Sequence, residues 1–213
     1  MASIRKIGRL FIVTRMEEIK SDIEESIAIK RLILDDDVLN NQIINLVDLC
    51  EKSLANGHKI IFCGNGGSFG DAQHLSAEFT SRFRFNRGAL ASVVLGANSS
   101  AISAIGNDYG FDNIFSRELE AIGKKGDIFI PITTSGNSSN IISAVNYANS
   151  SSIKTICLTG STGGLLRDLC ECLCVPSDKT ERIQESHIMI GHILCKMVEE
   201  RCFPKEAQDF NKS

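Results

Sequence analysis

The chain has 213 residues and is 43% hydrophobic, which is enough for one domain with a well-buried core. Its formal net charge of −3 provides no basic excess to hold a polyanion, and this argues against nucleic acid as a ligand. No apolar run approaches the length that crosses a bilayer, so we expect no membrane partner.

The chain begins with a segment that we interpret as a peripheral N-terminal extension, residues 1–16. It carries basic residues around the short apolar run 10–13 but lacks the longer apolar region and the cleavage site of a signal peptide. A start-site artefact or an extra turn of helix are the alternatives for its first fifteen residues. We expect a single domain over 17–202, followed by a C-terminal tail at 203–213.

The domain opens with a helical arm, 17–56, in which apolar residues recur at helical spacing. Asp35–Asp37 marks a break in this arm and supplies a cap for its second helix. Short apolar strands then alternate with turns and helices. We predict strands at 59–63, 91–95, 127–132, 154–158 and 171–175, and helices at 69–82, 101–106, 112–122, 139–150, 165–169 and 180–201. This alternation indicates an α/β fold whose parallel sheet is covered by helices on both faces.

A glycine-rich turn at Gly64–Ser68 leads from the first predicted strand into a helix. Its glycines allow backbone N–H groups to approach an anion, and the helix adds its positive end. Ser68 and Asp71 also fit the capping pattern S-x-x-D. The turn is a candidate substrate loop, with an ordinary tight turn as the alternative. Phe69 stands where a dinucleotide-binding fingerprint has its third glycine, which argues against that cofactor.

A second turn, Thr133–Ser138, follows the third predicted strand and contains four hydroxyl groups in six residues. Hydroxyls are neutral donors that suit a phosphate monoester when the following helix supplies positive potential. Each hydroxyl alone would more often be a cap or a turn residue. Their density in one turn favours phosphate binding.

His74 and Glu78 lie four residues apart on the helix after the first turn, and therefore on one face of it. On most helices this is an ordinary surface pair, but here it follows a glycine turn at the mouth of the sheet. The final predicted helix adds Gln184, His187 and His192 to an apolar run. One histidine in such a helix is usually a satisfied core residue, whereas two histidines and a glutamine suggest a site.

Eight cysteines are present, and none forms a C-x-x-C pair. Cys170, Cys172 and Cys174 alternate, which places them on one face of a strand. Because no metal-ligand spacing is evident, we interpret the cysteines as reduced, small hydrophobic residues of a cytoplasmic protein.

Six motifs occur in an order and at distances that resemble the sugar isomerase (SIS) domain family and, within it, the phosphoheptose isomerases. The resemblance covers nearly all of residues 17–202. The motifs are Gly-Asn-Gly-Gly-Ser at 64–68, Asp-Ala-Gln-His at 71–74, Gly-Asn-Asp-Tyr-Gly-Phe at 106–111, Phe-Ser-Arg at 115–117, Thr-Ser-Gly-Asn-Ser at 134–138 and Arg-Ile-Gln-Glu at 182–185. The resemblance implies a three-layer sandwich around a five-stranded parallel sheet, assembled as a homotetramer with active sites between subunits.

The resemblance also implies interconversion of D-sedoheptulose 7-phosphate and D-glycero-D-manno-heptose 7-phosphate through an enediol. This is the first step toward the ADP- or GDP-heptose of bacterial lipopolysaccharide or capsule. One alternative is a non-catalytic member of the fold that senses phosphosugars or binds a partner such as a replication-initiation factor. Retention of Glu78, Gln184 and His192 argues against it. Isomerisation of a different phosphosugar is a further alternative.

By the same resemblance Glu78 is the catalytic base and His192 its acid/base partner. One Zn²⁺ per subunit is implied, with the ligands His74, Glu78, Gln184 and His192. The implied substrate contacts are Asn65, Gly66, Gly67, Ser68, Glu78, Arg82, Asn107, Asp108, Thr133, Thr134, Ser135, Ser138 and Gln184. A glutamate that binds zinc is a weaker base, so the metal and base roles could be alternative states of one site. Pro131 replaces a small residue of the family and removes a backbone donor near the hydroxyl-rich turn.

Overall fold

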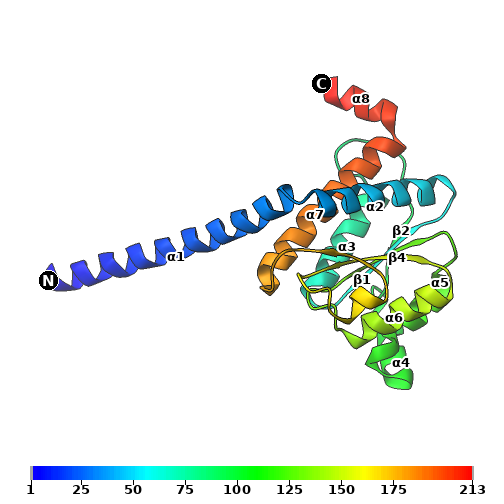
Figure 1. Ribbon diagram of the computed structural model, residues 1–213, viewed down its shortest axis with the longest axis horizontal. Coiled ribbons are helices and arrows are strands. Elements are labelled where there is room, and N and C mark those ends of the chain that lie inside the picture. Colours follow the sequence, from blue (N-terminus) through cyan, green and yellow to red (C-terminus); the bar gives the residue numbers. More distant parts are fainter. Residues whose placement is uncertain (1, 213) are drawn as a thin grey trace.

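The computed structural model describes residues 2–212 and contains one sheet of five strands (Figure 1). The strands are β1 (Ile60–Gly64), β2 (Ser92–Val94), β3 (Ile128–Ile132), β4 (Lys154–Thr159) and β5 (Glu171–Cys174). Their spatial order is β2-β1-β3-β4-β5, and every neighbouring pair is parallel. The predicted five-stranded parallel sheet is therefore confirmed.

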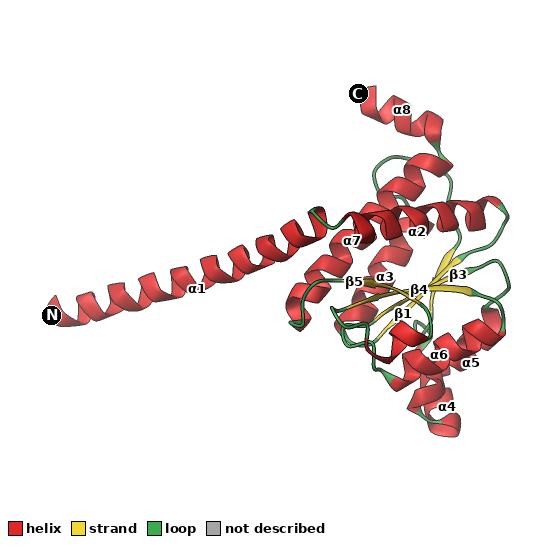
Figure 2. Ribbon diagram, in the orientation of Figure 1, coloured by secondary structure: helices red, strands yellow, loops and turns green. Residues whose placement is uncertain are grey.

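Helices cover both faces of this sheet, which gives the predicted three layers (Figure 2). One layer contains α2 (Asp37–Ala55), α3 (Gly67–Thr80) and α7 (Thr180–Cys202), and the other contains α4 (Ser99–Tyr109), α5 (Ile114–Ile122) and α6 (Ser139–Ser150). Successive residues of a strand pack against opposite layers. In β1, Ile60 and Phe62 belong to one apolar cluster, and Ile61 and Cys63 belong to the other. Burial on both faces explains why the strands read as continuous apolar runs.

Pro131 lies inside β3, a central strand, where a missing N–H interrupts the ladder toward β4. The two strands pair at Ile128 and Phe129 and again at Ile132, beyond the proline. The Thr133 N–H then donates to the Leu158 carbonyl at 3.0 Å, so the pairing is restored where the hydroxyl-rich turn begins.

The N-terminal arm is one helix, α1 (Ala2–Leu34), which projects away from the sheet (Figure 1). It runs through the boundary expected near residue 16 and ends at the predicted break. Asp36 caps α2, because its side chain accepts a hydrogen bond from the Leu39 N–H at 3.0 Å. Within residues 2–212, no helix, including the long α1, has an apolar stretch that could cross a membrane.

Several predicted boundaries were wrong. Helix α3 begins at Gly67, its N-cap is Gly66 with φ +55°, and no side chain caps it, so the predicted Ser68–Asp71 capping pair does not form. Helix α4 starts before residue 101 because the Asn98 side chain caps it. The segment predicted as a helix at 165–169 is a 3₁₀ turn, η2 (Gly164–Asp168). Two elements were not separately predicted: a short 3₁₀ turn, η1 (Phe111–Asn113), and helix α8 (Pro204–Lys212).

His187 is a core residue, as the usual reading of a histidine in an apolar helix suggests. It is fully buried, and its Nε2–H donates to the Thr159 carbonyl at 3.2 Å. Burial lowers the pKa of His187 to about 4, and the hydrogen bond to Thr159 only partly opposes this effect. The imidazole is therefore neutral at physiological pH.

This burial predicts an acid-sensitive contribution to stability. A histidine pKa that is lower in the folded state gives stability that is present above pH 6.5 and is lost as pH falls toward 4. We expect the free energy of unfolding to fall by roughly 3 kcal/mol more between pH 7 and pH 4 in the unmodified chain than in His187→Leu. Denaturant titrations at several pH values measure the difference, and parallel pH profiles would contradict it.

Candidate active site

Three of the predicted site residues meet where α3 faces α7. His74 and Glu78 lie one turn apart on α3, with the His74 Nε2 3.4 Å from the Glu78 Oε1. From α7, the His192 Nε2 lies 3.0 Å from the His74 Nε2. The side chain of Glu78 is mostly buried and that of His74 is half exposed. The structure thus places a carboxylate and two imidazoles within hydrogen-bonding reach, open to solvent on one side.

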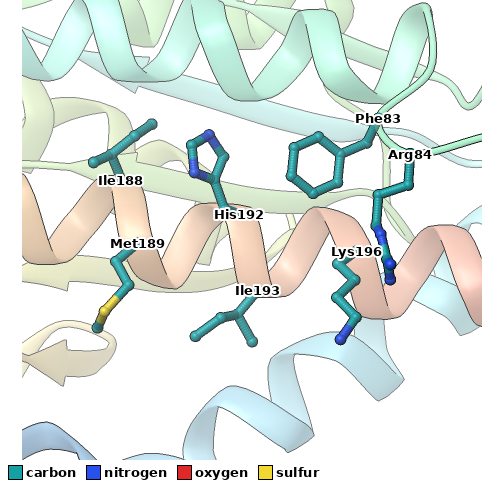
Figure 3. Close-up of a pocket in the computed structure, with 7 residues that line it drawn as sticks. All are labelled: Phe83, Arg84, Ile188, Met189, His192, Ile193 and Lys196. Atoms are coloured by element: carbon teal, nitrogen blue, oxygen red, sulfur yellow. The ribbon is translucent and has the colours of Figure 1, made fainter.

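Phe83 and His192 form one wall of an open hollow of about 550 Å³ along α7 (Figure 3). The two rings are stacked, with centroids 5.4 Å apart and planes inclined by 22°. The remaining lining residues are Arg84, Ile188, Met189, Ile193 and Lys196. The stacked phenyl ring restricts the orientation of the imidazole while leaving its Nε2 directed toward His74.

Asp71 also belongs to this cluster, although the sequence analysis predicted only a capping role for it. Its carboxylate is half buried, and its Oδ2 has no hydrogen-bond partner within the described chain. Burial raises the pKa of Asp71, while His74 and His192 oppose this shift through their charge. Asp71 is therefore placed to respond to the protonation state of the two imidazoles.

Two glycines allow α3 and α7 to approach this closely. A Cβ on Gly191 of α7 would lie 2.5 Å from the Leu75 side chain of α3. A Cβ on Gly67 would lie 2.6 Å from the Nε2 of Gln184, so this predicted ligand touches the glycine-rich turn. The contact places Gln184 beside the predicted substrate loop.

A buried ion pair fixes the chain that follows α3. Arg87 and Glu199 have almost no exposed side-chain surface, and the Arg87 Nε lies 3.0 Å from the Glu199 Oε1. The Glu199 carboxylate also accepts hydrogen bonds from the backbone N–H groups of Phe83 and Arg84, at 2.8 and 2.9 Å. Arg87 in turn donates to the Glu78 carbonyl at 2.7 Å. One network therefore ties the end of α3 and the backbone of Phe83 to α7.

The glycine-rich turn is held against the opposite layer of helices. Asn65 and Asn140, the latter on α6, form a reciprocal amide pair with two hydrogen bonds of 2.9 Å. Gly66 adopts a positive φ of +55°, a conformation that favours glycine. Ser68 is buried in the first turn of α3.

The hydroxyl-rich turn 133–138 connects β3 to the N-terminus of α6. The hydroxyls of Thr133 and Ser138 lie 3.4 Å apart, and Ser138 is the N-cap of α6 but makes no side-chain capping bond. Ser135 is exposed and accepts a hydrogen bond from the Asn137 N–H at 3.1 Å. Thr134 is partly exposed beside them. Hydroxyl groups and the start of a helix thus share one surface, as phosphate binding requires.

Other predicted site residues lie apart from this cluster. Asn107 and Asp108 are exposed on α4, on the opposite side of the sheet from α3 and α7, and line a separate hollow of about 550 Å³. The Asn107 side chain donates to Asp108 at 2.8 Å. Arg82 is exposed just after α3. Within a single chain, the structure therefore does not bring all the predicted substrate contacts to one place.

The predicted zinc ligands have suitable donor atoms. In the part of the chain that the structure describes, no three His, Cys, Asp or Glu side chains form a group ready to hold a metal ion. The imidazoles of His74 and His192 instead face each other directly. Nevertheless, the distances of 3.0 Å between the two Nε2 atoms and 3.4 Å from the His74 Nε2 to the Glu78 Oε1 resemble the ~3.3 Å edge of a tetrahedron with bonds of about 2.0–2.1 Å.

Comparisons with known proteins show the family of this chain. Residues 24–160 match the family model described as SIS domain. A phosphoheptose isomerase of Aneurinibacillus thermoaerophilus is 50% identical over 186 residues, covering 87% of this chain and 94% of that protein. The chain belongs to the phosphoheptose isomerase family of SIS-domain proteins.

Other phosphoheptose isomerases are similar to this chain in sequence and in structure. Phosphoheptose isomerase 2 of Campylobacter jejuni is 48% identical over 188 residues, covering 88% of this chain and 94% of that protein. The structure of a phosphoheptose isomerase from Francisella tularensis superposes with a TM-score of 0.83 at 37% identity, covering 87% of this chain and 98% of that chain. The confirmed fold and family therefore span nearly the whole length of these proteins.

The buried ion pair gives a testable prediction for this phosphoheptose isomerase fold. Arg87→Met should lower the free energy of unfolding by about 3–5 kcal/mol, because Glu199 would remain buried without its partner. Denaturant unfolding measures the loss. Arg117→Met is the matched control, since Arg117 pairs with Glu120 on the surface and should cost less than about 1 kcal/mol. Equal losses in the two variants would contradict the assignment.

Proposed function

We propose that this chain interconverts D-sedoheptulose 7-phosphate and D-glycero-D-manno-heptose 7-phosphate through an enediol intermediate. The product would enter the synthesis of ADP- or GDP-heptose for bacterial lipopolysaccharide or capsule. The observation that carries the proposal is the convergence of Glu78, His74 and His192 in a member of the phosphoheptose isomerase family.

Glu78 has the position and chemistry of the base in our proposal. Exchange of a ketose and an aldose requires removal of a proton from a carbon beside the carbonyl and its return to the neighbouring carbon. A carboxylate can do both. His192, whose ring is held against Phe83, would move the hydroxyl proton, because an imidazole exchanges protons near neutral pH.

The hydroxyl-rich turn would bind the phosphate of the substrate. Thr133, Ser135 and Ser138, with Thr134 beside them, offer neutral donors at the N-terminus of α6, whose dipole favours an anion. The glycine-rich turn would contact the sugar through Asn65, Gly66, Gly67 and Ser68. These two turns follow β1 and β3, which are neighbours in the sheet, so one substrate could reach both.

We further propose that His74, Glu78, Gln184 and His192 bind one Zn²⁺ ion. Their donor types suit zinc, and the His74 Nε2 lies 3.0 Å from the His192 Nε2 and 3.4 Å from the Glu78 Oε1, close to the separation of two ligands in a tetrahedral site. A bound Zn²⁺ would polarise the substrate carbonyl and stabilise negative charge on its oxygen.

Our proposal includes a cytoplasmic homotetramer whose active sites lie between subunits. Two observations support assembly. Met16, Ile19, Ile23 and Ile27 follow one another at helical spacing on α1, and each is at least 43% exposed. Asn107 and Asp108 also line a hollow on α4, which belongs to the other layer of helices from α3, the helix that carries Glu78. The cytoplasmic location is proposed because phosphorylated sugar intermediates are substrates found inside the cell.

Glu78→Gln tests the assignment of the base. The variant should lower kcat for sedoheptulose 7-phosphate at least 100-fold, because an amide cannot accept the proton. Ser138→Ala should instead raise KM, since it removes a phosphate donor and leaves the base in place. Initial rates with purified protein measure both effects.

The matched control is Glu120→Gln, which neutralises an exposed glutamate of the other layer and should leave turnover unchanged. Wild-type kcat in Glu78→Gln would refute the assignment of the base. Binding of sedoheptulose 7-phosphate without turnover by the unmodified chain would favour the non-catalytic alternative. Faster turnover of another phosphosugar would show that sedoheptulose 7-phosphate is not the preferred substrate.

Metal analysis tests the zinc proposal without reference to activity. The unmodified chain, loaded with a zinc salt and freed of excess, should retain about one Zn²⁺ per chain, and His74→Ala should retain far less. His58→Ala is the control, because His58 lies at the opposite end of the strands, beside Asp127. Absence of retained zinc, or an equal loss in both variants, would contradict the proposal.

A further inference from the structure

Helix α8, which follows α7 at the C-terminal end of the chain, packs against the segment 81–91 that connects α3 to β2 (Figure 1). This connecting segment has no helix or strand of its own. The Phe210 ring of α8 lies against the Phe85 ring, with centroids 5.9 Å apart and planes inclined by 41°. Phe85 is buried, whereas Phe210 is 39% exposed. An aromatic contact therefore holds the middle of the connecting segment to the C-terminal helix.

Phe210 also contacts a charged residue of the connecting segment. The guanidinium carbon of Arg84 lies 5.1 Å from the centroid of the Phe210 ring, which is a cation–π contact. The Arg84 Nη1 pairs with the Glu200 Oε1 of α7 at 2.7 Å. These two contacts hold the Arg84 side chain between α7 and α8.

The same segment carries two residues into the candidate active site. Phe83 stacks on His192, and Arg84 lines the hollow that contains both rings (Figure 3). Phe83, Arg84 and Phe85 are consecutive, so the backbone that carries the Phe83 ring is continuous with the two residues that Phe210 holds. A contact on α8 is thereby linked to the imidazole on α7.

The Glu199 network does not replace this link. Its carboxylate accepts hydrogen bonds from the backbone N–H groups of Phe83 and Arg84, and these bonds leave the two side chains free to rotate. The side-chain contacts come from other residues, because Phe83 stacks on His192 and Arg84 meets Glu200 and Phe210. Fixing the wall of the hollow therefore requires α8 in addition to the buried ion pair.

We propose that Phe210 is a positioning residue of the candidate active site. Through Arg84 and Phe85 it fixes the connecting segment, and through Phe83 this segment fixes the orientation of the His192 imidazole. The consequence for catalysis rests on the proposed isomerase function, in which His192 moves a proton, whereas the consequence for the His192 ring does not.

NMR of histidine-labelled protein tests the proposal without reference to activity. The stacked Phe83 ring shifts the signals of the His192 ring protons, because its ring current acts at the observed centroid distance of 5.4 Å. Phe210→Ala should move these signals, and Phe210→Tyr, which keeps the aromatic ring, should leave them in place. Ile122→Ala is the matched control, since Ile122 is 38% exposed, much like Phe210, but lies on α5 in the other layer. Unchanged His192 signals in Phe210→Ala would overturn the proposal.

Initial rates with sedoheptulose 7-phosphate test the consequence for the reaction. Phe210→Ala should lower kcat about tenfold and change KM less than about twofold, because it releases the acid/base group and leaves the phosphate-binding turn intact. Phe210→Tyr should restore kcat. Arg84→Met should also lower kcat, and the double variant should lose less than the product of the two single effects, since both residues act through one contact.

Two kinetic results would overturn the proposal: wild-type kcat in Phe210→Ala, or fully multiplicative losses in the double variant. Equal loss of kcat in Phe210→Tyr and Phe210→Ala would also overturn it, because the ring would then have no role. If the unmodified chain shows no turnover, the proposed function fails, and the His192 signals alone confirm or overturn the present inference.

Discussion

Close packing of α3 against α7 is the constraint on which the site depends. The two helices come from distant parts of the sequence, yet His74 and His192 are in contact. Close approach is possible because two glycines lack side chains: Gly191 lies against Leu75, and Gly67 lies against Gln184. A Cβ at either position would lie 2.5–2.6 Å from a side chain of the facing segment, which would have to move. The geometry of the proposed site therefore depends on close packing at two glycines.

The Arg87–Glu199 pair fixes the end of the same assembly. Burying two charges is costly, and this pair has the hydrogen bonds that offset the cost, because Glu199 receives two backbone N–H groups and Arg87 binds backbone carbonyls that include that of Glu78. Through Phe83, the network also reaches His192. In the proposed mechanism a proton is taken from one carbon and returned to the next, and a base and an acid that are both fixed in place reduce the reorganisation that each transfer requires.

Much of the fold could be predicted, because each β-strand is a short apolar run that ends in a turn with glycines or hydroxyls. The His74–Glu78 pair was also predictable, because residues four apart on a helix lie on one face. Phe83 and Glu199 could not be linked, because they are 116 residues apart in the sequence and nothing in the local pattern joins them. The start of α3 was misplaced because a glycine turn, not a side-chain cap, begins that helix, whereas Pro204 at the first position of α8 was a usable signal that was missed.

Our central claim is that a carboxylate on α3 and an imidazole on α7 move a proton between adjacent carbons of a phosphosugar. Isomerisation in D₂O followed by NMR or mass spectrometry tests this claim most directly. Proton transfer through exchangeable side chains predicts that solvent deuterium appears on the carbon next to the carbonyl, in both the product and the recovered substrate. Complete retention of the original hydrogen, as a direct hydride shift would give, would contradict the account.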